Sequence, residues 1–180
     1  MIIKKFENYV PPTWDEWFMK MMYLVATKSK DPRTKIGAVL VKDKRIISTG
    51  YNGICIGVDD VPEDRSSRPD KYKWYEHGER NSIFSAASIG IPVNGSTMYT
   101  NGTPCCDCTR AIIQSGVKKV VIHKTYEEMF LQMLAEKNST QWIGHNDVSH
   151  RMLKESNVEL VIWDGFLDVD AYLDGNVFKL

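Results

Sequence analysis

The sequence has no excess of charge of either sign, because 23 Lys and Arg residues balance 23 Asp and Glu residues among 180 residues. Proteins that coat nucleic-acid backbone carry a basic excess, so the balance argues against a nucleic-acid partner but not against a single nucleotide as ligand. The chain also lacks the run of roughly 20 apolar residues that a membrane helix needs, and its first residues lack a signal-peptide core. We therefore expect a cytoplasmic protein with no membrane partner.

Internal repeats and low-complexity segments are also missing. The 43% hydrophobic and 26% charged residues are ordinary globular values, which excludes wholesale disorder. One hydrophobic core commonly serves about 100–200 residues. We expect residues 1–180 to form a single domain.

Cysteine is scarce, and its placement is uneven. Three of the four cysteines, Cys105, Cys106 and Cys108, lie within four residues, and Cys55 stands apart. This layout is poor for disulfides that join distant segments, so metal ligands, a reactive thiol or core packing are the better explanations. We expect Cys106 to be a core residue, and the sequence suggests no role for Cys55.

Hydrophobic periodicity and turn residues predict alternating helices and strands. A capping-box pattern, Thr13 with Glu16, opens the first helix. The expected helices span residues 13–29, 77–89, 105–115, 126–137 and 148–155. The expected strands span residues 36–41, 45–50, 96–100, 117–122 and 158–163. An opening hairpin followed by strand–helix alternation predicts an α/β fold, a three-layer α/β/α sandwich with a five-stranded mixed sheet.

Two short motifs at helix starts carry the chemistry. His77 and Glu79 open one expected helix, and Cys105 and Cys108 open the next. Cysteines three residues apart share a helix face, so their sulfurs can converge on one ion with His77 as third ligand. Zinc prefers such ligands, and with three of them it keeps a position for water, whose pKa it lowers towards about 7. Glu79 is then suited to carry protons as general acid and base.

The combined pattern H-x-E followed by P-C-x-x-C is typical of zinc-dependent nucleobase deaminases. Further blocks in the chain resemble deoxycytidylate (dCMP) deaminases of the cytidine deaminase superfamily, of the type also found in bacteriophages. These blocks are residues 35–39, 50–53, 77–81, 104–108 and 111–117. The resemblance extends from about residue 14 to 163.

The resemblance implies hydrolysis of dCMP to dUMP and ammonia, which supplies dUMP for dTMP synthesis. It implies that Glu79 carries the proton. The Gly78 N–H and the Thr103 carbonyl would contact the pyrimidine edge, and Asn52 would contact the sugar.

Cations near these blocks are candidates for binding the phosphate, because phosphate favours charge-assisted donors. They are Arg33, Lys35 and Arg80, and Asn81 is a further candidate for contacting the nucleotide.

The resemblance also implies regulation, in which dCTP activates and dTTP inhibits, with Mg²⁺ accompanying the effector. The candidate residues for this site are Tyr51, Gly53, Arg65 and Arg68. Homohexamers are common in the resembled family, so we expect a homo-oligomer.

Gly78 stands where the resembled family usually has alanine, and this difference leaves base selectivity open. Alternatives are deamination of another cytosine nucleotide, such as dCTP or 5-modified dCMP, and a non-catalytic, zinc-stabilised nucleotide-binding module. His123, His145 and His150 show no paired ligand spacing, so we expect structural or surface roles for them.

Overall fold

The computed structural model describes residues 9–60, 65, 67, 69–137 and 140–180. Helix α1 (Trp14–Ala26) begins with the predicted capping box, in which the Glu16 N–H donates to the Thr13 hydroxyl and the Thr13 N–H donates to the Glu16 carboxylate, each at 3.3 Å. One face of α1 is buried, which confirms the predicted amphipathic helix, although it ends three residues earlier than expected.

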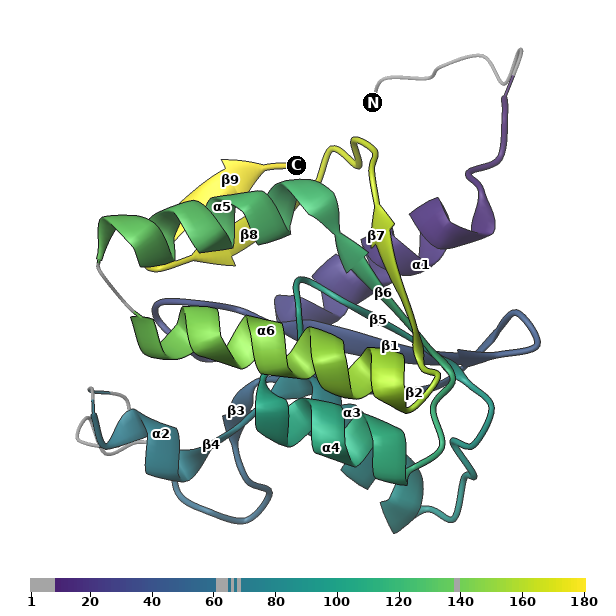
Figure 1. The fold of residues 1–180 in the computed structure, drawn as a ribbon, viewed down its shortest axis with the longest axis horizontal. Coiled ribbons are helices and arrows are strands. Elements are labelled where there is room, and N and C mark those ends of the chain that lie inside the picture. The colour runs from purple at the N-terminus through teal and green to yellow at the C-terminus, as the bar shows by residue number, and fades with distance from the viewer. Residues whose placement is uncertain (1–8, 61–64, 66, 68, 138–139) are drawn as a thin grey trace, which may run out of the picture.

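The central sheet confirms the predicted five mixed strands. They are β1 (Gly37–Lys42), β2 (Arg45–Tyr51), β5 (Thr97–Thr100), β6 (Lys119–His123) and β7 (Glu159–Trp163). Their order is β2-β1-β5-β6-β7. β1 is antiparallel to both β2 and β5, whereas β5, β6 and β7 are parallel (Figure 1). β5 therefore joins the antiparallel and parallel parts of the sheet.

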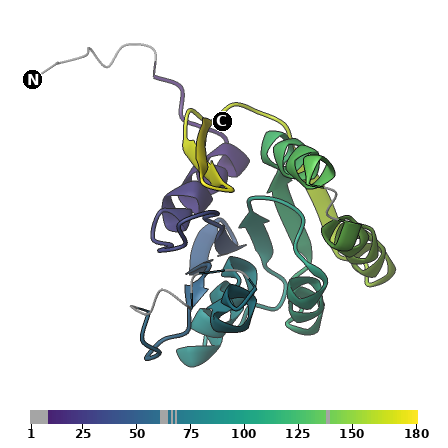
Figure 2. The ribbon, with the colours of Figure 1, turned by 90° about the vertical axis from the view of Figure 1, so that its left-hand side faces the viewer.

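Helices cover both faces of the sheet, as the three-layer prediction required (Figure 2). One face packs against α3 (Gly78–Ser88), α4 (Cys106–Gln114) and α6 (Thr140–Glu155), and the other against α1 and α5 (Lys124–Glu136). Strand alternation divides the core between these faces: Val39 and Val41 of β1 join the cluster with α1 and α5, and Leu40 joins the other cluster. α6 begins eight residues before the predicted start of its helix, because Gly144 and the polar residues around it weaken the periodicity of its first half.

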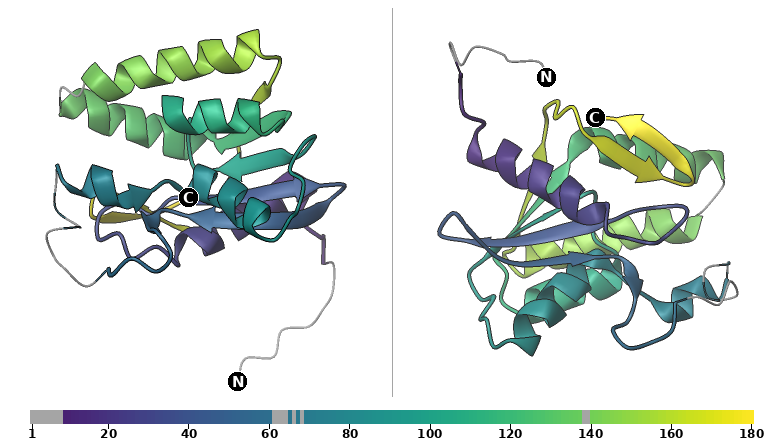
Figure 3. Two further views of the ribbon diagram at one scale, coloured as in Figure 1. Left: turned by 90° about the horizontal axis from the view of Figure 1, so that it is seen from below. Right: turned by 180° about the vertical axis from the view of Figure 1, so that it is seen from behind.

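Two small sheets lie outside the predicted strands. β8 (Asp170–Leu173) and β9 (Asn176–Lys179) form a hairpin through Asp174 and Gly175, whose φ angles are 51° and 83°. Seen from behind in Figure 3, this hairpin lies beside α1. In the long polar connection, β3 (Gly53–Ile54) pairs with β4 (Tyr75–Glu76), which follows the short helix α2 (Lys71–Trp74). Among the described residues, no helix is long and apolar enough to cross a membrane.

Candidate active site

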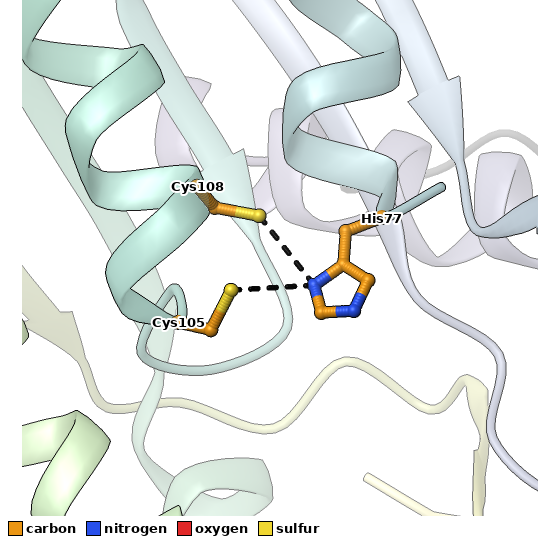
Figure 4. A group of neighbouring side chains, drawn as sticks. All are labelled: His77, Cys105 and Cys108. Carbon is orange, nitrogen blue, oxygen red and sulfur yellow. Dashed lines mark hydrogen bonds between the residues drawn. The ribbon is translucent and has the colours of Figure 1, made fainter. Parts of the chain in front are cut away.

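The site lies where two helices begin on the same face of the sheet. His77 is the N-cap of α3, Cys105 is the N-cap of α4, and Cys108 lies in the first turn of α4. The His77 Nδ1 atom lies 3.4 Å from the Cys105 sulfur and 3.5 Å from the Cys108 sulfur (Figure 4). The structure therefore brings together the three side chains that the sequence proposed as metal ligands.

The geometry of these three atoms fits a zinc ion. Zinc bound tetrahedrally to sulfur at about 2.3 Å and to nitrogen at about 2.0–2.1 Å sets the two donors about 3.6 Å apart. The measured nitrogen–sulfur distances agree with this value. The positive ends of the α3 and α4 helix dipoles also lie at the site, where they favour thiolates.

The three ligands are electrostatically coupled. Hydrogen bonds with Cys108 and His77 lower the pKa of Cys105 to about 4, while the bond to Cys105 and burial raise the pKa of Cys108. Burial opposes the charged form of His77, but the bond to Cys105 and the charge of Glu79 outweigh it and raise the pKa of His77 to about 9. Without a metal, protons therefore remain on His77 and Cys108, and a bound metal ion must displace both.

Glu79 lies in the first turn of α3, with only 6% of its surface exposed. Its Oε2 atom is buried and has no hydrogen-bond partner among the described residues. Burial raises the pKa of Glu79 above its usual value. A buried carboxylate with a vacant acceptor next to a set of metal ligands is suited to move protons to and from a ligand.

The first turn of α3 is held in place by direct contact with β2. A Cβ atom on Gly50 would lie 2.2 Å from the Ser82 nitrogen and 2.4 Å from the Gly78 carbonyl oxygen, so only glycine permits this approach. The Ser48 hydroxyl also donates to the Ser82 carbonyl at 2.7 Å. These contacts fix the helix turn that carries Glu79.

A cavity of about 680 Å³ opens onto the metal ligands. Its walls include His77, Cys105, Glu79 and three further residues that the sequence singled out, namely Asn52, Arg80 and Thr103.

Asn52 is held by the protein on every side of its amide group. Its Oδ1 accepts the Ile36 N–H at 2.8 Å, and its Nδ2 donates to Asp31 at 3.0 Å and to the Thr34 carbonyl at 2.8 Å. Both amide hydrogens are thus used within the protein, so a ligand can meet Asn52 only at its oxygen.

The candidate phosphate residues occupy different places. Arg80 lines the cavity, but its guanidinium pairs with Glu76 at 2.6 Å and lies 3.7 Å from Asp107. Arg33 pairs with Asp174 at 3.4 Å, and Lys35 donates to the Ser29 carbonyl; neither is among the cavity-lining residues.

Gly78 and Asn81 are two further residues for which the sequence analysis predicted contacts with the nucleotide. A Cβ atom on Gly78 would lie 3.0 Å from the Ile36 carbonyl oxygen, so the glycine allows Ile36, which lines the cavity, to approach more closely than alanine would. Asn81, two residues beyond Glu79, donates its Nδ2 to the Tyr51 carbonyl at 2.9 Å and is not among the cavity-lining residues.

The residues suggested for effector binding lie in or near the long polar connection. Tyr51 is 37% exposed, Gly53 pairs with Glu76, and the Arg65 guanidinium lies 4.5 Å from the centre of the Trp74 ring. The structure places none of these three among the residues that line the cavity. Arg68 lies outside the described residues.

Two buried charged residues that the sequence analysis did not assign also line or support the cavity. Lys71, 7% exposed, pairs with Asp31, which also holds Asn52, and both line the cavity. Glu127, also 7% exposed, accepts hydrogen bonds from Thr103. A lysine or glutamate alone gives no local signal of burial, because its partner is distant in the sequence.

The remaining cysteines and histidines lie outside the ligand set. Cys106 is buried with its sulfur 3.5 Å from the His145 carbonyl oxygen, and Cys55 is exposed. His123 is fully buried between Tyr23 and Gly165, and His150 contacts Thr103.

Comparison with known proteins identifies the family. Residues 12–124 match the model of the cytidine and deoxycytidylate deaminase zinc-binding region. ComE operon protein 2 of Bacillus subtilis is 36% identical over 116 residues, which span 64% of this chain and 61% of that protein. Human deoxycytidylate deaminase is 36% identical over 124 residues, spanning 66% of this chain and 67% of the human enzyme.

A solved structure supports the same relationship. The dCMP deaminase of cyanophage S-TIM5, in complex with dCMP and dUMP, is 26% identical and superimposes with a TM-score of 0.64. The match covers 86% of this chain and all of the cyanophage chain. Given this likeness, the matched family model and the convergent His77, Cys105 and Cys108, the chain belongs to the cytidine and deoxycytidylate deaminase family.

Proposed function

We propose that the protein hydrolyses dCMP to dUMP and ammonia with a zinc ion held by His77, Cys105 and Cys108. The observation that carries the proposal is the buried, unpartnered Oε2 of Glu79 beside three convergent metal ligands. The relatives named above include a deoxycytidylate deaminase and a dCMP deaminase bound to dCMP and dUMP, which supports dCMP as the substrate.

When bound, zinc supplies a water molecule activated at neutral pH. With zinc held by these ligands, Glu79 would carry both protons of the water in turn through its vacant oxygen, one to the ring nitrogen N3 and one to the departing amine, so that C4 would gain an oxygen and ammonia would leave. The raised pKa of Glu79 suits the uptake of a proton, because a carboxylate of higher pKa is a stronger base.

Backbone groups beside the metal ligands are suited to orient the base. The N–H of Gly78 lies at the start of α3, where helix N–H groups have no partner within the helix. Thr103 lines the cavity directly before the segment that carries Cys105, so its carbonyl is the proposed acceptor for the pyrimidine edge. Asn52 also lines the cavity and is the proposed residue that offers its oxygen to the sugar.

For the phosphate, we favour Arg80 and Lys71 over Arg33 and Lys35, because the first two line the cavity. Both are already paired with carboxylates, so a phosphate would compete with Glu76 or Asp31 for them. Asn81 would then hold the Tyr51 backbone through its hydrogen bond to the Tyr51 carbonyl and would not contact the nucleotide.

Regulation and assembly form a further part of the proposal. Activation by dCTP, inhibition by dTTP, an accompanying Mg²⁺ and a homohexamer would fit an enzyme that supplies dUMP for dTMP synthesis. Tyr51, Gly53, Arg65 and Arg68 are the candidate effector residues, and they lie apart from the residues that line the cavity or outside the described part of the chain.

The test is an assay of released ammonia with zinc-loaded protein and dCMP, dCTP, 5-methyl-dCMP, deoxycytidine or a tRNA hairpin as substrate. We expect dCMP to give the highest kcat/KM, and dCTP and dTTP to shift the dCMP saturation curve in opposite directions. Turnover of dCTP or of the hairpin without turnover of dCMP would contradict the proposed substrate. Nucleotide binding with no ammonia from any substrate would instead favour a non-catalytic zinc module.

A further inference from the structure

The segment between β5 and Cys105 is anchored by a carboxylate from another helix. Glu127 of α5 accepts the Thr103 N–H on Oε2 and the Thr103 hydroxyl on Oε1, each at 2.8 Å. Oε1 also accepts the Asn146 side-chain N–H of α6 at 2.9 Å. Glu127 is 7% exposed, so these bonds form in a buried setting where losing a partner is costly.

A second residue of α6 completes the anchor. The Nε2 atom of His150 lies 3.0 Å from the Thr103 hydroxyl oxygen. Because that hydroxyl donates its hydrogen to Glu127, it accepts from His150. Asn146 and His150 are four residues apart and share one face of α6.

These bonds determine which group of Thr103 can meet a ligand. The backbone N–H and the side-chain hydroxyl are both used by α5 and α6, yet Thr103 lines the cavity. The polar group left for the cavity is the carbonyl oxygen, which is a hydrogen-bond acceptor only.

The neighbouring glycine shows how close this approach is. A Cβ atom on Gly102 would lie 2.6 Å from Oε2 of Glu127. Any other residue at position 102 would push the carboxylate away from Thr103. Glycine and glutamate at these positions are therefore sterically matched.

We propose that Glu127 is a positioning residue for base recognition, which fixes the Thr103 peptide so that its carbonyl accepts a hydrogen bond from the amino group of an aminopyrimidine. This inference rests on the proposed deaminase function and extends it. It makes α6, through Asn146 and His150, part of the machinery that distinguishes cytosine from uracil, because uracil has an acceptor where cytosine has its amino group.

The test compares Glu127→Gln with Glu128→Gln, a matched control at the adjacent, exposed position. Glutamine keeps the shape of glutamate but has one acceptor oxygen, and its amide hydrogens would face one of the donors. We expect Glu127→Gln to keep one zinc per chain and to lower kcat/KM for dCMP about 10- to 100-fold, mainly through KM. We expect inhibition by dUMP to change less than about threefold, since dUMP lacks the amino group. Glu128→Gln should match the parent protein.

Several results would overturn the inference: equal kcat/KM in the two variants, equal weakening of dCMP and dUMP, or loss of zinc as the sole cause of the defect. If Glu127→Gln does not fold, Thr103→Val decides the question, because it removes only the hydroxyl. A raised KM for dCMP with zinc retained would support the inference, and an unchanged KM would refute it.

If the proposed function is wrong, neither the parent protein nor Glu128→Gln will show deamination. The anchor is then tested by hydrogen exchange at the Thr103 amide, which needs no substrate. Faster exchange in Glu127→Gln than in Glu128→Gln would support the positioning role, and equal exchange would refute it.

Discussion

Two buried glutamates, Glu79 in the cavity wall and Glu127 behind the cavity-lining Thr103, differ in their surroundings. Glu79 has a vacant, buried oxygen beside the metal ligands, whereas both oxygens of Glu127 accept hydrogen bonds from Thr103 or Asn146. The two residues have nearly equal exposure, 6% and 7%. Burial alone therefore does not identify a proton carrier; a vacant hydrogen-bonding position next to the reacting groups does.

The comparison assigns Glu79 to proton transfer and Glu127 to holding neighbouring segments in place. A buried carboxylate oxygen without a partner is destabilising, so the fold retains Glu79 at a cost in stability that its chemistry justifies. A buried carboxylate with three donors stabilises the segments it joins.

The largest effect is expected from removing zinc. Chelation, or Cys108→Ser, removes the group that Glu79 serves, so deamination should fall below detection while the Glu127 anchor persists. Activity, zinc content and exchange at the Thr103 amide measure the three effects. Full activity in protein shown to be metal-free would contradict the proposed mechanism.

Replacing Glu79 should come next. We expect Glu79→Gln to retain zinc and nucleotide binding but to lose about 10²- to 10⁴-fold in kcat, because the proton carrier is gone. Steady-state kinetics with metal analysis would measure this loss. A kcat within threefold of the parent protein would show that Glu79 is not the proton carrier.

Replacing Glu127 and replacing Glu79 should change the stability of the protein differently, and here Glu127 should matter more. In zinc-free protein at pH 7, we expect Glu127→Gln to lower the free energy of unfolding by about 1–3 kcal/mol, because a buried donor loses its acceptor. Glu79→Gln should raise that free energy or leave it unchanged. Since burial raises the pKa of Glu79, the unfolded chain loses this proton first as pH rises, so ionisation lowers stability above the usual glutamate pKa and the Glu79→Gln difference should disappear in acid. Urea titrations at pH 4 and pH 7 test both signs.

The smallest effect concerns a third buried titratable group, His123. Its Nε2 donates to the Gly165 carbonyl and its Nδ1 accepts from the Tyr23 hydroxyl, both at 2.9 Å, and burial lowers its pKa. Because the unfolded chain binds this proton first, stability should fall as pH drops below the usual histidine pKa of about 6.5. In His123→Gln this contribution to the slope should vanish; an unchanged slope would assign it to other groups.

Local patterns predicted most of the fold. The capping box at Thr13, the alternating strands and the glycine and proline stops are set by neighbours in the sequence, and the structure confirms the sheet they predict. The β8–β9 hairpin was not predicted, although its Asp174–Gly175 turn is a strong hairpin signal, because the flanking strands are only four residues long. The first half of α6 was also not predicted, since Gly144 and polar residues weaken its pattern.

The candidate site also has a part that local sequence patterns predicted and a part that they did not. His77 with Glu79, and Cys105 with Cys108, are close in the sequence, and the combined H-x-E and P-C-x-x-C pattern predicted that the two pairs share a site. Glu127 meets Thr103 across 24 residues, and such a contact leaves no local pattern. Arg33 and Lys35 were predicted as phosphate contacts from charge and nearness to the motifs, and whether a cation lines the cavity depends on partners that only tertiary structure supplies.

The position of β5 at the centre of the sheet also governs how the chain can acquire its metal. β5 leads directly into the segment that carries Cys105, and it pairs with β1 on one side and β6 on the other. In the native structure the two sulfurs meet His77 beside this strand, which is held between neighbours that precede and follow it in the chain. In a refolding experiment, the moment at which zinc becomes bound would therefore report the arrival of the central strand, and the order of folding events could be timed by the metal itself.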